Sequence, residues 1–512
     1  GLLSDDNLEP EPRLDHSAAW GWFRGGKKLD DLLQGTEHQR FIFSDRFLST
    51  NHLLNEGYWI WVIPLASGLL SVGVGWDENA AEVLPEMPKT QEQLREFLLG
   101  HEMLRELIGE AEMEDFGSFH HMARRPKRFV SPEREAWIGT AAGFVDPFFS
   151  NGIDMIGLGC EAACDAIGRD LAGQLDPARI EAHNEAILLY FEHYVLSVAG
   201  LYRTFASQEL SVLRYRREVH VYWALYTWAY LNGQVLEPES LSELRPALQE
   251  SHRRDRFFTK LMRGAYRILR ERGDLRRFNK GRYTFNQLGW RFVPYVRFEQ
   301  YVGGPMDLAR SREAIREIDT GCLLAILDVL FDGDRSPQSD LMFQALHGEV
   351  YERFLARSEE HEELDQAFYE ELLVALNGPL AAQLAAEGVE LGERALTPAR
   401  FSRAFHGLSL GLEPEQAAAV RRRFNSKPRL TDFSDLPRDR EKVQRRVPFG
   451  VEHTPWMDEP PTFRSIYDLL GDEWWGDEAQ PFAVLKRVQA ELAESAARKQ
   501  AAAERRAELS TS

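Results

Sequence analysis

The residues that could do chemistry gather in one stretch, 137–171, where small and polar residues lead into an apolar helix. Its small residues are Gly139, Ala141, Ala142, Gly143, Gly152, Gly157 and Gly159. Glycine inside a helix costs about 1 kcal/mol against alanine, so Gly157 and Gly159 indicate close approach of a flat ligand or another backbone. We expect a short buried strand over 136–139, a loop over 141–151 and a helix from Gly152. The free N–H groups at the start of that helix favour an anionic group, and a reduced flavin is flat and partly anionic.

Two segments resemble a known family. GTAAGFVDPFFSNGID, beginning at Gly139, resembles the second flavin-contacting segment of FAD-dependent halogenases and related monooxygenases. Phe144, Pro147, Ser150 and Gly152 fall on its F..P..S.G pattern. Upstream, residues 59–64 read W-x-W-x-I-P, the motif associated with flavin-dependent halogenases. Two motifs in the family's order argue against a chance match, and the resemblance covers roughly residues 10–230.

The resemblance implies a fold and an activity. The expected fold is α+β, the C-terminal part of a two-domain FAD monooxygenase-like fold: an antiparallel substrate-domain sheet, a flavin-contacting helix and then a large all-α region. The implied activity is halogenation of an electron-rich aromatic, phenol, pyrrole or carrier-bound substrate, through a flavin C4a-hydroperoxide and hypohalous acid. One alternative is an FAD-dependent monooxygenase (hydroxylase) on the same scaffold. Another is a non-catalytic helical interaction protein.

The family's residue roles carry over onto matching positions. The expected FAD contacts are Gly139, Thr140, Ala142, Phe144, Asp146, Pro147, Ser150, Asn151, Gly152 and Ile153. The expected halide contacts are Ser150, Asn151 and Gly152. The expected substrate-pocket residues are Trp59, Trp61, Ile63 and Pro64. Because Trp59 and Trp61 alternate along a strand, both indoles face one side, and packing as core aromatics stays open for them.

The chain also departs from the family pattern. Thr140 stands where the family has an aspartate that contacts the ribityl chain of the flavin. Phe149 stands where tryptophan halogenases have a glutamate, which favours phenols, pyrroles or carrier-bound aromatics over free tryptophan. No G-x-G-x-x-G strand–turn–helix fingerprint for the FAD pyrophosphate is present. The family's catalytic lysine would precede residue 1, and neither Lys27 nor Lys28 takes that role, so the catalytic residue is unknown. We therefore expect a fragment of a longer flavoprotein that is inactive alone; the alternative is a natural chain that has lost FAD binding.

Composition limits the partners. The formal net charge of −20 makes nucleic acid a poor partner. The three cysteines form no metal-ligand or disulfide pattern, so no metal is expected. No signal peptide is recognised, and the most apolar helical run, 219–231, is too short to span a membrane. We expect a cytoplasmic oxidoreductase of secondary metabolism, working on a small aromatic or carrier-protein-bound substrate, whose FAD is reduced by a separate flavin reductase or by NAD(P)H.

Hydrophobic periodicity predicts the remaining elements. The expected strands are 17–24, 116–122 and a hairpin of 59–65 with 69–76 about 66–68; the expected helices are 90–108, 177–202 and 212–231, with helices over 318–377. The predicted domains are 1–175 (partial FAD and substrate domain), 176–310 (helical pocket or cap) and 311–512 (helical, role unknown). The basic stretch 252–282 is either a solvated face paired with the protein's own acids or a dock for an acidic carrier protein.

Overall fold

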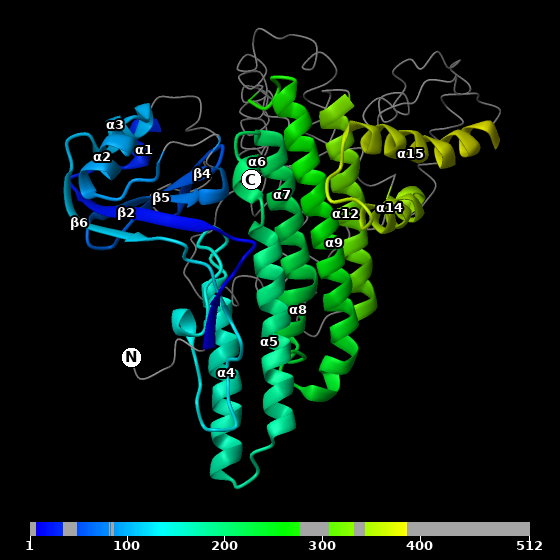
Figure 1. The fold of residues 1–512 in the computed structure, drawn as a ribbon, viewed down its shortest axis with the longest axis horizontal. Coiled ribbons are helices and arrows are strands. Elements are labelled where there is room, and N and C mark those ends of the chain that lie inside the picture. The colour runs from blue at the N-terminus through cyan, green and yellow to red at the C-terminus, as the bar shows by residue number, and fades with distance from the viewer. Residues whose placement is uncertain are drawn as a thin grey trace, which may run out of the picture. The chain divides into compact units, whose positions relative to one another are not determined.

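The computed structural model describes residues 7–33, 49–80, 82, 86–276, 307–331 and 344–386. The chain divides into two compact units, Gly1–Lys28 with Phe47–Arg438, and Leu29–Arg46 with Asp439–Ser512. The described part of the second unit includes the short helix α1 (Leu29–Leu33). The elements below belong to the first unit, whose antiparallel sheet and long helices confirm the α+β class (Figure 1). The part of the predicted helical region 311–512 that follows residue 386 lies outside the described residues.

A five-stranded antiparallel sheet lies in the N-terminal part, in the order β3-β4-β5-β2-β6. Its strands are β2 (His16–Arg24), β3 (Asn51–Asn55), β4 (Tyr58–Pro64), β5 (Leu69–Asp77) and β6 (Glu112–Phe119). The predicted hairpin is confirmed, because β4 pairs with β5 from Tyr58↔Trp76 to Pro64↔Leu70. Alternation along β4 puts Ile60 on one face of the sheet, with Trp59 and Trp61 on the other.

Two short helices cover the sheet face opposite Trp59. The predicted helix over 90–108 is two helices, α2 (Gln91–Leu99) and α3 (Glu102–Ile108), separated at Gly100. The Thr90 hydroxyl caps α2 by accepting from the N–H of Gln93. Phe97 on α2 then packs against Tyr58 and Trp76, with ring centroids 5.3 and 5.5 Å away.

The predicted strand over 116–122 is too long at its C-terminal end. Strand β6 ends at Phe119, and His121 has a φ of 48°, a conformation that a β-strand cannot contain. The N–H of Met122 instead donates to the carbonyl of His16 at 2.8 Å. A separate two-stranded ribbon follows, in which β1 (Leu8–Pro10) pairs with β7 (Arg124–Pro126).

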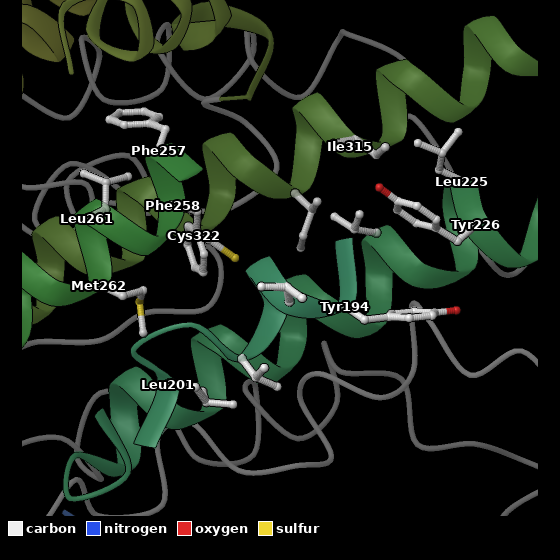
Figure 2. Close-up of a cluster of buried hydrophobic side chains, with 14 of the residues drawn as sticks. Tyr194, Leu201, Leu225, Tyr226, Phe257, Phe258, Leu261, Met262, Ile315 and Cys322 are labelled. Carbon is white, nitrogen blue, oxygen red and sulfur yellow. The ribbon is translucent and has the colours of Figure 1, made fainter. Parts of the chain in front are cut away.

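Helices, most of them long, follow the sheet and the ribbon in the described part of the first unit (Figure 1). They are α4 (Gly152–Leu171), α5 (Pro177–Val198), α6 (Leu201–Thr204), α7 (Gln208–Val221), the π-helix η6 (Tyr222–Thr227), α8 (Trp228–Leu231), α9 (Pro238–Glu271), α12 (Leu308–Phe331), α14 (Gln344–Ser358) and α15 (Gln366–Ala386). The helix predicted over 177–202 breaks at Gly200, whose φ of 68° ends α5 and starts α6. Side chains of α5, η6, α9 and α12 pack in one apolar cluster, of which Figure 2 shows Tyr194, Leu225, Phe258 and Cys322.

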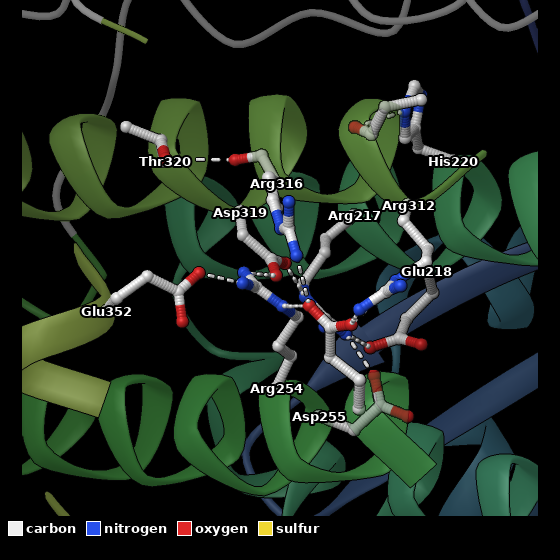
Figure 3. A network of polar contacts seen from close by, with 12 residues as sticks. Arg217, Glu218, His220, Arg254, Asp255, Arg312, Arg316, Asp319, Thr320 and Glu352 are labelled. Carbon is white, nitrogen blue, oxygen red and sulfur yellow. Dashed lines mark hydrogen bonds and ion pairs between the residues drawn. The ribbon is translucent and has the colours of Figure 1, made fainter. Parts of the chain in front are cut away.

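The basic stretch on α9 is largely paired with the protein's own groups. Arg254 and Asp255 are about 1% exposed and lie in a buried ion network with Arg217 and Asp319 (Figure 3). On the outer side, Arg253 pairs with Glu359. These contacts favour the self-paired interpretation over a free basic dock for residues 252–276; residues 277–282 lie outside the described part.

Candidate functional site

The segment that carries the flavin-like motif is a turn and a loop leading into α4. The expected strand over 136–139 is wrong: Ala136 forms only an isolated bridge to Val130, and Gly139–Ala141 is one turn of 3₁₀ helix, η5. Gly139 has a φ of 65°, which turns the chain and ends any extended segment there. Residues 142–151, here called the motif loop, then run to the start of α4 at Gly152.

The N-terminus of α4 is open on one side. Ser150 has a φ of 60°, an uncommon conformation for a residue with a side chain, and it lies exposed with Gly152 and Ile153. No described side chain caps this helix, and a Cβ added to Gly152 would meet nothing within 4 Å. The first turn can therefore present backbone N–H groups to a flat or anionic group.

No described part of the chain approaches the two helix glycines as closely as the sequence predicts. A Cβ on Gly159 would lie 3.7 Å from the carbonyl of Trp137 and 3.8 Å from the ring of Phe129, and one on Gly157 would lie 3.6 Å from the hydroxyl of Tyr230. These are ordinary van der Waals distances to the protein's own groups. An alanine side chain would therefore fit at either position, so the described contacts do not require glycine there.

The W-x-W-x-I-P motif forms most of β4. Trp59 is 2% exposed and joins the hydrophobic core, whereas Trp61 is half-buried and its indole N–H donates to the Ser71 hydroxyl at 3.2 Å. Their rings lie 5.3 Å apart. Each indole lies over a glycine of β5, since a Cβ on Gly73 would come within 2.2 Å of Trp61 and one on Gly75 within 2.4 Å of Trp59. The glycines on this face are therefore required by the two indoles.

The structure brings the two motifs together. The ring of Phe148, in the motif loop, meets the ring of Trp59 edge to face at 5.1 Å. His52 on β3 completes the group, with its ring 4.7 Å from Trp59 and 5.1 Å from Phe148. Phe205, just after α6, lies 4.8 Å from Phe148 on another side. No periodicity in the sequence connects His52 or Phe205 with the motif loop, so neither residue can be identified from the sequence alone.

Asp146 is the most buried polar group of the motif loop, at 3% exposure. Its Oδ2 accepts hydrogen bonds from His16 Nδ1 and from the Tyr202 hydroxyl, both at 2.7 Å, and its Oδ1 accepts from the N–H of Phe148 at 2.8 Å. His16 and Tyr202 are stacked at 4.3 Å. His16 carries no motif that could have identified it.

A half-exposed aromatic wall lies beside the start of α4. Phe149 stacks at 6.5 Å on Tyr215 of α7, and Tyr222 and Trp223 follow in the π-helix η6. Asp154, in the first turn of α4, accepts from the hydroxyls of Tyr194 and Tyr222 at 3.0 and 3.3 Å. Burial raises the pKa of Asp154 despite these donors. The π-helix η6 is a feature often found at functional sites.

One face of α4 is apolar and exposed along five turns. This α4 stripe consists of Ile153, Ile156, Cys160, Cys164, Ile167 and Leu171. Ile153, Ile167 and Leu171 are 74, 59 and 83% exposed. The stripe begins at the open N-terminus of the helix. A single exposed aliphatic side chain needs no explanation, but a continuous row along a helix face is typical of a surface that another element covers.

The remaining predicted residues are distributed around this centre. Phe144 pairs with Arg124 through reciprocal backbone hydrogen bonds of 2.8 and 3.0 Å. Ala142 and Asn151 are buried, Pro147 is half-buried and Thr140 is exposed. Ile63 and Pro64 end β4, away from the Trp59–Phe148 contact in the strand register. Among the described residues, no three His, Cys, Asp or Glu side chains come together as metal ligands, and no helix is both long and apolar enough to cross a membrane.

Comparison with known proteins finds partial sequence similarity to flavin-dependent halogenases. No protein-family model matches the chain. The flavin-dependent halogenase chlA of Dictyostelium discoideum is 27% identical over 195 residues, which cover 36% of this chain and 31% of the relative. The flavin-dependent halogenase armH1 of Armillaria mellea is 28% identical over 234 residues, 42% of each chain.

Among solved structures, halogenase PltM covers 61% of this chain and 59% of its own at 18% identity and a TM-score of 0.38, too low to carry an argument. The sequence relatives all bear one description, and the chain spans between 31 and 42% of their length. Over this matched part, the chain is similar in sequence to flavin-dependent halogenases.

Proposed function

We propose that this chain forms the flavin- and substrate-facing part of an FAD-dependent halogenase. The observation that carries the proposal is the contact between the two family motifs: Trp59 of W-x-W-x-I-P and Phe148 of the F..P..S.G segment pack against each other at 5.1 Å. Two motifs that served unrelated purposes would have no reason to share one surface. The described geometry thus agrees with the function that the sequence relatives bear.

The residues present fit a flavin at the start of α4. The exposed backbone at Ser150 and Gly152, the open space beside Gly152 and the positive end of the α4 dipole suit a flat, partly anionic edge, or a halide in contact with it. Gly139 and Thr140 lie on the rim of the same loop, and Thr140 offers a hydroxyl to a ribityl chain. Bound FAD in its reduced form would supply the oxygen chemistry that oxidises the halide. The chain's own part is to orient the cofactor and exclude water.

The proposed substrate is an electron-rich aromatic: a phenol, a pyrrole or a carrier-bound ring. Its wall would be Trp61 on the sheet side, with Phe149, Tyr215, Tyr222 and Trp223 on the helix side. Flat aromatic walls suit a flat ring, since offset and edge-to-face contacts each stabilise by about 0.5–1.5 kcal/mol. The absence of a carboxylate at Phe149 supports a substrate without the amino acid group of free tryptophan.

The α4 stripe suits the part of the flavoprotein that binds the FAD pyrophosphate. Because the stripe continues directly from the proposed flavin edge, a nucleotide-binding layer that holds the other end of the same cofactor would lie along it. Covering Ile153, Ile167 and Leu171 would remove three large exposed aliphatic side chains from water. We propose that the 512 residues are inactive without such a layer.

The test is the visible spectrum of the purified full-length protein that contains these residues, compared with that of the 512-residue chain. The proposal expects a flavin absorption band in the full-length protein and none, or a much weaker one, in the chain alone after FAD is added and excess removed. A colourless full-length protein that retains no added FAD would contradict it and would favour a non-catalytic helical interaction protein.

A further inference from the structure

We propose that His16 and Tyr202 are positioning residues that hold the motif loop in its flavin-facing conformation through the carboxylate of Asp146. That the loop faces a flavin rests on the proposed function. That His16 and Tyr202 position the loop rests on their contacts alone. Neither residue belongs to a family motif. His16 begins β2 and Tyr202 lies in α6, so the two hold the loop from the sheet and from the helices.

Both carboxylate oxygens of Asp146 accept hydrogen bonds. His16 Nδ1 and the Tyr202 hydroxyl both donate to its Oδ2 at 2.7 Å. Its Oδ1 accepts from the N–H of Phe148 at 2.8 Å, which closes the turn at Pro147. A carboxylate with only 3% exposure needs such donors, because an unpaired buried charge costs several kcal/mol. The carboxylate of Asp146 therefore fixes the position of the Phe148 backbone.

The rings of His16 and Tyr202 stack on each other, which couples the positions of the two residues. The two rings lie 4.3 Å apart with an interplanar angle of 18°, so a rotation of either ring would move the other. The ring of Tyr202 also meets Trp59 edge to face at 6.5 Å and Phe205 at 5.2 Å. The same tyrosine thus contacts the W-x-W-x-I-P strand and, through Asp146, the F..P..S.G loop.

The contacts of Asp146 also hold the residues that lead into the open N-terminus of α4. Phe148 is held on its N–H by Asp146 and on its ring by Trp59, and the N–H of Ser150 donates to the carbonyl of Pro147 at 3.2 Å. Ser150 can keep its uncommon φ of 60° only while the preceding residues are fixed. Loss of a donor to Asp146 would release this strain and let the rim of the proposed flavin site relax.

The experiment measures amide hydrogen exchange in the full-length protein and its variants Tyr202→Phe and His16→Phe. Both variants keep the ring stack and remove one donor. Exchange in the peptide spanning 144–152 is expected to rise by about tenfold, the loss that follows from one charge-assisted hydrogen bond, with little change in peptides of α9. Tyr369→Phe is the matched control, since its hydroxyl is equally buried and donates to the carbonyl of Leu261 at 2.6 Å.

A pH series separates positioning by His16 from general stabilisation. Burial lowers the pKa of His16, but Asp146, Asp77 and Asp15 raise it, and the net pKa lies above the ordinary value. Loop protection is therefore greatest below about pH 6.5 and is lost as pH rises through the raised pKa of His16. This dependence is expected to remain in Tyr202→Phe and to vanish in His16→Phe.

Three outcomes would overturn the proposal: an unchanged loop in both variants, the same loosening in Tyr369→Phe, or a pH dependence that survives in His16→Phe. If either phenylalanine variant fails to fold, Asp146→Asn, which keeps an acceptor for Phe148, must loosen the loop in the same way. FAD retention is measured in parallel. A loop that loosens as expected in a protein that binds no FAD would uphold the positioning and contradict the proposed function.

Discussion

Trp59 and Phe148 meet with their ring centroids 5.1 Å apart and their planes at 81°, although one lies on β4 and the other in the loop before α4. Edge-to-face aromatic pairs stabilise by about 0.5–1.5 kcal/mol beyond the area that they bury. Phe148 also lies two residues before Ser150, at the start of the proposed flavin site. It connects the stability of the fold with the geometry of the site.

Replacing Phe148 with alanine tests that connection. The ring contacts Trp59, His52, Phe149 and Phe205, so Phe148→Ala is expected to lower the free energy of unfolding by about 2 kcal/mol, less than for a fully buried phenylalanine. Urea denaturation measures the change. Phe119→Ala removes a phenylalanine that is 63% exposed and should cost less than about 0.5 kcal/mol. Equal losses in the two variants would show that Phe148 is not integrated into the core.

The ion pairs of Glu192 predict how the stability of the protein changes at acid pH. It accepts from Arg13 and Arg125, and so ties the β1–β7 ribbon to α5. Burial opposes the charge, but the two guanidinium groups more than offset it and lower the pKa of Glu192 to about 2. Because the folded pKa is depressed, this contribution to stability is present above about pH 4.5 and lost as pH falls toward 2.

Glu192→Gln is therefore expected to flatten the acid limb of the unfolding curve between pH 4.5 and 2, while lowering stability at pH 7. Thermal unfolding across that range measures both effects. The control is Glu313→Gln on α12, whose carboxylate is 54% exposed and pairs with Arg310. An acid limb in Glu192→Gln as steep as in the unmodified protein would refute the assignment.

The sheet and the motifs could be predicted from the sequence because their signals are local. Alternation in β4 and β5 gives the hairpin and its two faces, and the glycines opposite the indoles fit their close approach. The site could be predicted only in part. The motif loop was identified, but the strand expected at 136–139 is a 3₁₀ turn, since Gly139 takes a positive φ that the sequence does not reveal.

Contacts between residues far apart in the chain could not be predicted from the sequence. His16 and Tyr202 reach Asp146 only because β2 and α6 converge there, and a single sequence does not encode that pairing in a local pattern. The same holds for the basic stretch: Arg254 reads as a surface charge until α12 brings Asp319 to it at 3.2 Å. The three-part division at residues 175 and 310 stays a prediction.

The buried ion network predicts a large loss from one substitution. Arg217 is 0% exposed and pairs with Asp255 at 2.7 Å and Asp319 at 2.6 Å (Figure 3). Arg217→Met would leave both carboxylates without this shared cation in the helix core. The expected loss is about 3–5 kcal/mol in the free energy of unfolding, measured by urea denaturation.

Arg253→Met is the matched control, since Arg253 is 41% exposed and pairs with Glu359 at the surface. Its expected cost is about 0–1 kcal/mol. An Arg217→Met protein as stable as Arg253→Met would mean that the network relaxes on losing its central cation and does not depend on it.

Charged substitutions in the α4 stripe are expected to weaken FAD retention by the full-length protein without lowering the stability of the 512-residue chain. In the 512-residue chain, the double variant Ile167→Glu/Leu171→Glu should unfold within about 0.5 kcal/mol of the unmodified chain, because both side chains are exposed. In the full-length protein, the same variant should retain less FAD after gel filtration, because charge would face the nucleotide-binding layer. Val374→Glu, at a position 63% exposed on α15, should leave FAD retention unchanged. FAD retention unaffected by the double variant would exclude the stripe as that contact.

The central claim is halogenation, and the most direct measurement is product analysis by mass spectrometry. The full-length protein would receive reduced FAD, oxygen and a panel of phenols, pyrroles and carrier-bound aromatics, with chloride, with bromide and with neither halide. If the protein is a halogenase, the products should carry the supplied halogen and form only when halide is present. A hydroxylated product that forms equally well without halide would contradict halogenation and identify the protein as a flavin monooxygenase on the same scaffold.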